Sequence, residues 1–177
     1  MTQRRTIKQG LYDPFTEHDS CGVGFLCHIK GKKSHRIVRD AIKILENLTH
    51  RGATGSDPLT GDGAGILIQM PDKFFQKICA QTSINLPASG EYGVGMVFLP
   101  ENLESRNQIE EWIEHVIAEE GQKFLGWRDV PFNAEKIGHI ARSAMPVFRQ
   151  VFIGSGHDTS AERFEIKLHV IRKRMFN

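Results

Sequence analysis

The sequence predicts one domain of mixed α/β or α+β type, in which helices are layered on a sheet. The chain has 177 residues, of which 40% are hydrophobic and 25% charged, so it can bury one sizeable core and is too short for two large ones. Along the chain, segments with apolar residues at helical spacing alternate with short runs of strand-forming residues. This order is typical of layered domains, but it does not distinguish a doubly wound sheet from stacked antiparallel sheets.

The first half of the chain contains two expected strands and two expected helices. Residues 22–29 (GVGFLCHI) and 66–70 (ILIQM) have strand-like composition. Ser34 favours an N-cap, and a helix begins after it. A short helix follows over residues 72–82. The apolar faces of these helices consist of Val38, Ile42, Leu45 and Leu48, and of Phe75, Ile78, Cys79 and Thr82.

The second half contains three expected strands and two longer helices. The strands cover residues 92–99, 124–130 and 146–154, and Pro100 ends the first because proline cannot donate to a strand ladder. Capping-box spacing occurs before both helices, and Gly121 ends the first of them. The two boxes pair Ser105 with Gln108 and Thr159 with Glu162. The apolar faces consist of Ile109, Trp112, Ile113, Val116 and Ile117, and of Phe164, Leu168, Ile171 and Met175.

Charge and hydropathy exclude several classes of partner. The formal net charge is +2 and is spread along the chain, which argues against nucleic acid as a partner. The one dense basic cluster, Arg172 to Arg174, is expected to be a solvated helix end. No window approaches eighteen consecutive apolar residues, and no apolar signal core follows residues 1–10. We therefore expect a cytoplasmic protein that does not span a membrane.

The cysteines and tryptophans are expected to be structural, with one exception. Cys21, Cys27 and Cys79 are an odd number and describe no disulfide framework. Their spacing does not match a zinc knuckle, so we predict no metal site in this chain. Cys27, Cys79, Trp112 and Trp127 are expected to lie in the core, whereas the sequence around Cys21 sets that residue apart.

A glycine-rich stretch over residues 50–65 (HRGATGSDPLTGDGAG) is the strongest candidate for a functional loop. It contains five glycines and one proline. A P-loop requires a lysine after its last glycine, and a dinucleotide-binding loop requires a strand before it and a helix after it, so neither pattern fits. A long surface loop stays open as an interpretation. His28, His35 and His50 fall in no recognisable cysteine–histidine pattern and are more typical of structural histidines.

Several motifs, in this order, resemble one family. They are CGVGF, HIKGKKSH, ILENLTHRGATGSDPLTGDGAGILIQMPDKFF, YGVGMVFLP and GWRDVP. Together they resemble the start of the glutamate synthase large (alpha) subunit, in the N-terminal part of its class II, N-terminal-nucleophile glutamine amidotransferase domain. The resemblance implies an α+β fold, the αββα sandwich of that hydrolase type, incomplete in this chain. It divides the chain into a propeptide-like segment over residues 1–20 and an amidotransferase part over residues 21–177.

The resemblance also assigns the candidate site. Removal of residues 1–20 would make Cys21 the first residue, with its own α-amine available as the base for its thiol. Arg51 and Gly52 match the family's HRG motif, and we expect Arg51 to fix the cysteine end of the site. Asp62 matches a family loop position that supports the site. The implied substrate is glutamine, whose ammonia would feed reductive glutamate synthesis from 2-oxoglutarate.

Other parts of the family pattern do not occur in this sequence. The family forms its oxyanion hole from an Asn-Gly pair, and an arginine and an aspartate hold the α-carboxylate and α-amine of the substrate. No asparagine in this sequence is followed by glycine. We therefore expect the isolated chain to be inactive. The last helix stops without a C-cap glycine, which predicts that the domain continues past Asn177. Full-length members use FMN, an iron–sulfur cluster and an electron-donating reductase or ferredoxin, for none of which we expect a site here. The alternative is a truncated, non-catalytic remnant or partner-binding fragment.

Overall fold

The computed structural model describes residues 10, 22–49, 57, 59–61, 63–157 and 159–175. The chain divides into two compact units. The N-terminal unit consists of Met1–Gln69 and Lys136–Arg142, and the sheet unit consists of Met70–Glu135 and Ser143–Asn177.

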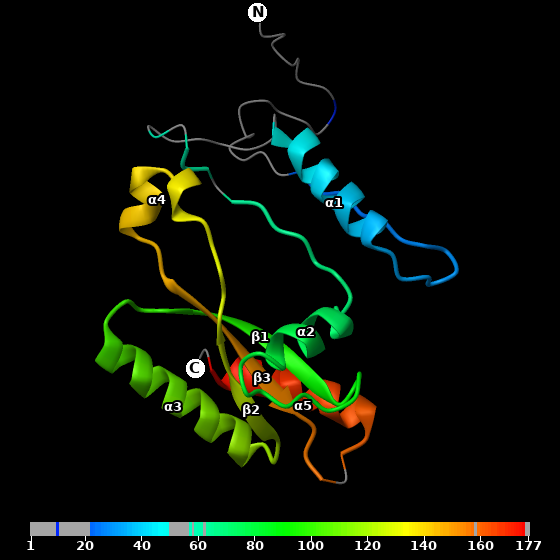
Figure 1. The fold of residues 1–177 in the computed structure, drawn as a ribbon, viewed down its shortest axis with the longest axis vertical. Coiled ribbons are helices and arrows are strands. Elements are labelled where there is room, and N and C mark those ends of the chain that lie inside the picture. The colour runs from blue at the N-terminus through cyan, green and yellow to red at the C-terminus, as the bar shows by residue number, and fades with distance from the viewer. Residues whose placement is uncertain are drawn as a thin grey trace, which may run out of the picture. The chain divides into compact units, whose positions relative to one another are not determined.

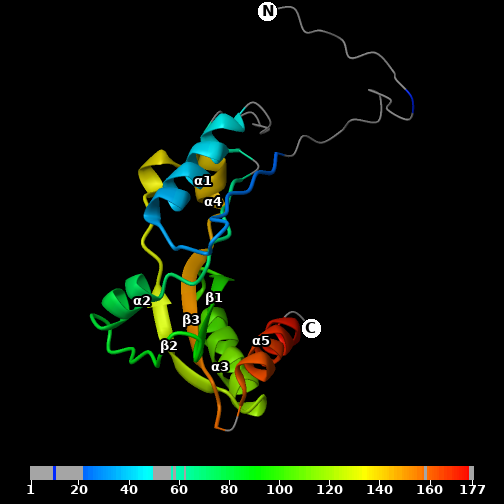
Figure 2. The same cartoon turned by 90° about the vertical axis from the view of Figure 1, so that its right-hand side faces the viewer.

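The described part of the sheet unit is built around a three-stranded antiparallel sheet. Its strands are β1 (Tyr92–Leu99), β2 (Lys123–Asp129) and β3 (Val147–Gly154), in the order β1-β3-β2. Helix α2 covers one face, and helices α3 and α5 cover the other, as Figure 2 shows. The helices are α2 (Asp72–Cys79), α3 (Leu103–Glu119) and α5 (Ala161–Arg174). The α+β prediction is therefore confirmed, whereas the second sheet of the expected sandwich is not among the described elements.

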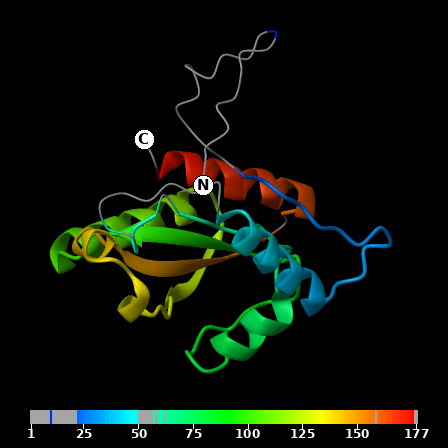
Figure 3. The same ribbon diagram turned by 90° about the horizontal axis from the view of Figure 1, so that it is seen from above.

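Strand β3 is central because its side chains are buried alternately in two cores. Val151 and Ile153 pack on the face that α3 and α5 cover. Phe152, between them, packs on the opposite face against Phe75 and Cys79 of α2. The Phe75 and Phe152 rings meet edge to face with centroids 5.4 Å apart, an arrangement that aromatic pairs prefer. Figure 3 shows α5 and α2 on opposite sides of the sheet.

Two helix caps differ from the prediction. Asn102, rather than Ser105, caps α3, because its side-chain oxygen accepts the backbone N–H of Ser105 at 2.9 Å. Ser160, rather than Thr159, caps α5 by accepting the N–H of Arg163 at 3.3 Å. In both cases the actual N-cap lies within three positions of the predicted one, and its side chain is an equally good acceptor for a backbone N–H. Residue type alone therefore does not select the cap.

The predicted end of α3 is confirmed. Gly121 has φ +71°, a left-handed conformation that favours glycine. Its N–H bonds the carbonyl of Ala118 at 2.9 Å, and the N–H of Gln122 bonds the carbonyl of Ile117 at 3.0 Å. This pair of bonds is a Schellman motif, which satisfies two of the last carbonyls of the helix.

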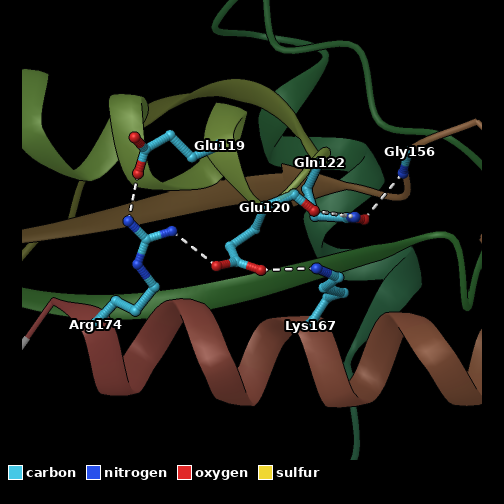
Figure 4. A network of polar contacts seen from close by, with 6 residues as sticks. All are labelled: Glu119, Glu120, Gln122, Gly156, Lys167 and Arg174. Atoms are coloured by element: carbon cyan, nitrogen blue, oxygen red, sulfur yellow. Dashed lines mark hydrogen bonds and ion pairs between the residues drawn. The ribbon is translucent and has the colours of Figure 1, made fainter.

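Charged side chains join α3 to α5 at the end of α3 (Figure 4). Lys167 and Arg174 of α5 each bind Glu120, both at 2.7 Å, and Arg174 also binds Glu119. The prediction of a merely solvated basic helix end is thus wrong for Arg174. Nearby, Gln122 accepts the N–H of Gly156 at 3.0 Å and so ties the turn before α5 to the end of α3.

The core predictions for two side chains are wrong. Trp112 is 48% exposed on α3, because the face that meets the sheet is formed by the helix positions of Ile113, Val116 and Ile117. Cys27 is exposed, in contrast to Cys79, which is buried. Trp127 packs against the core as predicted, and its indole N–H donates to Glu114 at 2.8 Å.

The N-terminal unit is held together differently. Its helix α1 (His35–Asn47) is capped by Ser34 as predicted, but none of its residues is buried. The short helix α4 (His139–Ser143) begins in this unit, after the 3₁₀ turn η3 (Ala134–Lys136), and no element was predicted there. Among the unit's described residues, only Asp57 and Gly138 are buried.

The two strands predicted for the N-terminal unit are not present. Residues 22–29 and 66–70 form no strand, and Phe25 and Leu67 are 89% and 101% exposed. A strand requires a neighbour to complete its backbone hydrogen bonds, and no described segment supplies one to either stretch. The predictions of strands at residues 22–29 and 66–70 are therefore wrong.

Truncation of Phe152 should be the most costly change in the sheet unit. Phe152→Ala removes a fully buried ring and is expected to lower the free energy of unfolding by about 3–5 kcal/mol. The matched control, Phe98→Ala, removes a ring that is 65% exposed and should cost less than about 1 kcal/mol. Urea denaturation measures both, and equal losses would contradict the central role of β3.

The charged contacts between α3 and α5 predict a pH-dependent stability. Hydrogen bonds from Lys167 and Arg174 hold the pKa of Glu120 below its usual value, and Arg174 does the same for the pKa of Glu119. A lowered carboxyl pKa contributes stability above the unfolded pKa, and this contribution is lost as the pH falls through the folded pKa. Arg174→Met should therefore be less stable than the native chain at pH 7, and the difference should shrink as the pH falls below about 4.

Thermal unfolding between pH 3 and pH 8 measures this difference. The exposed neighbour Arg172 provides the control, since Arg172→Met removes the same charge from the same helix. A stability difference of constant size across the whole pH range would mean that the ion pairs are not its source.

Candidate functional site

The residues that the sequence assigns to the site lie outside the described residues. These are Cys21, Arg51, Gly52 and Asp62. Described residues directly follow Cys21, precede Arg51 and lie between Arg51 and Asp62 in the sequence. These neighbours form a framework around the candidate site, and all of them belong to the N-terminal unit.

The segment that follows Cys21 packs on α1 through glycine backbone. A Cβ atom at Gly22 would lie 2.8 Å from Cδ2 of Leu48, and a Cβ atom at Gly24 would lie 2.7 Å from Cγ2 of Ile44. Both distances are shorter than real carbon contacts, so a larger residue at either position would force the side chain of Leu48 or Ile44 to shift. The alternation of glycine in GVGF thus serves contact with a helix rather than a strand ladder.

A tight turn returns the chain from this segment to α1, as the blue part of Figure 1 shows. The N–H of Gly31 bonds the carbonyl of His28 at 2.7 Å. Nδ1 of His28 accepts the N–H groups of Lys30 at 3.2 Å and Lys32 at 3.4 Å. His28 therefore has a structural role in the turn, as its sequence context predicted.

These contacts join two parts of the predicted site motif. Gly22 stands one residue after Cys21, and Leu48 stands three residues before Arg51. The contact between Gly22 and Leu48 therefore brings together the chain that leaves the candidate nucleophile and the chain that leads to the HRG motif. The two ends lie 26 positions apart in the sequence.

A second contact fixes the middle of the glycine-rich stretch. The carboxylate of Asp57 accepts the Thr60 hydroxyl at 2.8 Å and the N–H of Leu59 at 3.0 Å. It also accepts the N–H of Ile140 at 3.3 Å, and Nδ1 of His139 lies 3.1 Å from the same oxygen. We call this set of contacts the Asp57 clamp. It ties Asp57 and Thr60 to the first turn of α4, about eighty positions later in the chain.

Gly138 makes the Asp57 clamp sterically possible. A Cβ atom there would lie 2.2 Å from Oδ2 of Asp57 and 2.3 Å from Oγ1 of Thr60. Its own N–H bonds the carbonyl of Leu59 at 3.3 Å. Backbone and side chains of the two segments therefore interlock at a position where any larger residue would displace the carboxylate.

The surroundings of Asp57 favour its charged form. The hydrogen bond from the Thr60 hydroxyl lowers the pKa of Asp57 most, and the N–H groups of Leu59 and Ile140 and the charge of His139 act in the same direction. Burial opposes these contacts but does not outweigh them. Asp57 thus remains an anion that can accept from several donors at once.

Sequence reasoning missed Asp57, Thr60, Gly138 and His139. An aspartate followed three residues later by threonine in a loop could have indicated an Asx turn, in which the aspartate side chain accepts a hydrogen bond from a nearby backbone N–H. No local signal could have paired that turn with Gly138, because the two stretches lie far apart in the sequence.

The described residues contain neither a cluster of metal ligands nor a helix that could span a membrane. No group of three or more histidine, cysteine or acidic side chains there could hold a metal ion. None of the described helices is both long and apolar enough to cross a bilayer. Of the described thiols, Cys79 is buried in the sheet unit, and burial raises its pKa, which keeps it a protonated core side chain.

Comparisons with known proteins agree on one family. Residues 21–177 match the model of the family described as glutamine amidotransferases class-II. The chain is 52% identical over 170 residues to a glutamate synthase (NADPH) large chain of Bacillus subtilis, covering 96% of this chain and 11% of that protein. It is 44% identical over 172 residues to a glutamate synthase (NADH) of Schizosaccharomyces pombe, covering 94% and 8%.

A plant relative extends this range. The chain is 37% identical over 163 residues to the chloroplastic ferredoxin-dependent glutamate synthase 2 of Arabidopsis thaliana, covering 92% of this chain and 10% of that protein. The chain thus spans about a tenth of the length of the curated relatives that it matches.

Loss of the Thr60 hydroxyl should raise the pKa of Asp57. Thr60→Val removes the strongest of the contacts that stabilise the carboxylate, while keeping nearly the same side-chain volume. Carbon-13 NMR titration of the Asp57 carboxyl measures the change. Thr49→Val is the control, because the Thr49 hydroxyl bonds the carbonyl of Glu46 and has no contact with Asp57. An unchanged pKa in Thr60→Val would contradict the described geometry.

Proposed function

The chain belongs to the class-II glutamine amidotransferases, and we propose that it carries the glutamine-hydrolysing part of a glutamate synthase. The observation that supports this proposal best is the contact of Gly22 with Leu48, which joins the chain after Cys21 to the chain before Arg51. A nucleophile at the start of the mature chain and an arginine some thirty residues later need such a junction to act in one site. The glycine at position 22 makes the junction close.

In the proposed reaction, Cys21 supplies both the nucleophile and the base. Its α-amine, with a pKa of about 8, takes the proton of the thiol, and the thiolate attacks the γ-amide carbon of glutamine. The α-ammonium then gives that proton to the leaving nitrogen, which departs as ammonia and leaves a γ-glutamyl thioester. Water then hydrolyses the γ-glutamyl thioester, which releases glutamate and restores the thiol. Arg51 and Gly52 would fix the cysteine end of this site, and Asp62 would support it.

Residues 1–20 act in this proposal as a propeptide that keeps the site inactive. While they are attached, the nitrogen of Cys21 is an amide, which has no basic lone pair to accept a proton. Their removal converts the amide into an amine. Processing is therefore the step that creates the base.

The remaining features of the proposal depend on the longer protein. An αββα sandwich would be completed, and an Asn-Gly oxyanion hole supplied, by chain beyond these 177 residues, so the isolated segment is expected to be inactive. Ammonia would pass to 2-oxoglutarate, and FMN with an iron–sulfur cluster would supply electrons from a reductase or ferredoxin. We assign none of these cofactors to residues of this chain, and we propose the cytoplasm as its compartment.

Replacement of Cys21 tests the proposal. In the protein as its host makes it, Cys21→Ser should lower glutamine hydrolysis by more than about 10³-fold, because the hydroxyl is a far weaker nucleophile than the thiolate. The matched control is Cys27→Ser, which removes an exposed thiol from the same unit and should leave the rate within about twofold. Ammonia release from glutamine measures both.

The intact mass and N-terminal residue of the same preparation complete the test. A mature chain that begins at Cys21 is expected. A chain that keeps residues 1–20 and still hydrolyses glutamine would disprove the role of the α-amine, and full activity in Cys21→Ser would disprove the nucleophile.

A further inference from the structure

The Asp57 clamp lies between two residues of the proposed site. Arg51 precedes Asp57 by six residues, and Asp62 follows Thr60 by two. Residues 57, 59 and 60 are described, and each takes part in a bond that belongs to the clamp. The clamp also contains the buried residues of this unit. Among the described residues of the N-terminal unit, only Asp57 and Gly138 are buried.

We propose that Asp57 and Thr60 are positioning residues for glutamine hydrolysis, which hold the loop between Arg51 and Asp62 against the first turn of α4. This inference rests on the proposed function, because it assigns a task to that loop. Neither residue touches the reacting atoms in this proposal. Each acts through the loop that it anchors.

The reach of the chain gives the clamp its effect. Two residues of extended chain span about 7 Å at most, and six span about 20 Å. The sequence between Arg51 and Asp62 contains three glycines, and glycine loses more backbone entropy on ordering than other residues do. Because Asp57 and Thr60 are already held by the clamp, less chain entropy remains to be lost when the site is assembled.

The contacts of the clamp suit a positioning role because they are numerous and directional. The Asp57 carboxylate accepts from a hydroxyl and two backbone N–H groups, with His139 beside it. Several hydrogen bonds to one buried anion fix its position more closely than packing of apolar side chains would. Gly138 is equally specific, because a Cβ atom at that position would overlap the carboxylate.

The experiment compares variants of the full protein as its host makes it. Asp57→Asn weakens the clamp by replacing an acceptor oxygen, Thr60→Val removes the hydroxyl, and Gly138→Ala displaces the carboxylate without removing any polar group. Each should lower kcat for glutamine hydrolysis by about ten- to hundredfold, since small misplacements of catalytic groups cost rates of this order. KM for glutamine should stay within about threefold, because Arg51 is assigned to the cysteine end of the site. Thr60→Ser, which keeps the hydroxyl, should restore kcat.

Two controls separate positioning from stability. Asp72→Asn alters another partly buried carboxylate, which accepts the Tyr92 hydroxyl at 2.9 Å in the sheet unit, and it should lower the melting temperature without lowering kcat. Glutamate synthesis from added ammonia bypasses glutamine hydrolysis, so it should be unchanged in all variants. A parallel loss of the ammonia reaction would show a purely structural role and overturn the proposal.

The outcomes distinguish this inference from the function on which it rests. If the native protein hydrolyses glutamine and the folded Thr60→Val and Gly138→Ala variants match its kcat, the positioning role is wrong and the proposed function stands. If the native protein does not hydrolyse glutamine, the proposed function fails first. Thr60→Val and Gly138→Ala keep the test decisive even where Asp57→Asn does not fold.

Discussion

Close packing of side chains on glycine backbone is the constraint on which both units depend. In the N-terminal unit, Gly22 admits Leu48, and Gly138 admits the carboxylate of Asp57. In the sheet unit, Gly93 of β1 admits Leu168 of α5, whose Cδ1 would lie 2.6 Å from a Cβ atom there. An added methyl group would force the leucine side chain to shift at Gly22 and Gly93, and at Gly138 it would overlap two hydrogen-bonded oxygens, so the absence of a side chain sets how closely these groups pack.

The two units nevertheless use different forces once the segments are in contact. In the sheet unit, β3 is buried on both faces, and the hydrophobic effect on Val151, Phe152 and Ile153 dominates. In the described part of the N-terminal unit, no apolar side chain is buried, and the two buried residues form a polar contact. The first unit is therefore sensitive to loss of volume, and the second to loss of hydrogen bonds.

The sequence predicted the elements whose signals are local. Helical spacing located α1, α2, α3 and α5, and strand composition located β1, β2 and β3. The same composition failed over residues 22–29 and 66–70, because a strand also needs a partner that composition does not reveal. Caps were displaced by one to three residues, since Asn102 and Ser160 accept as well as the predicted Ser105 and Thr159. Motif resemblance identified the candidate site residues Cys21, Arg51, Gly52 and Asp62. The Asp57 clamp could not be predicted from the sequence, because its two segments lie far apart in the chain.

A charged residue is the suitable anchor for a loop of this composition. The stretch from His50 to Gly65 has five glycines and few large apolar side chains, so it cannot gain much free energy from hydrophobic burial. Its glycines also lose more backbone entropy on folding than other residues do. One carboxylate that accepts several donors offsets this loss at a single position, provided that every donor it binds stays paired. An apolar residue at position 57 would leave the hydroxyl of Thr60 and the N–H groups of Leu59 and Ile140 without that acceptor, which is why the anchor is ionic although it is buried.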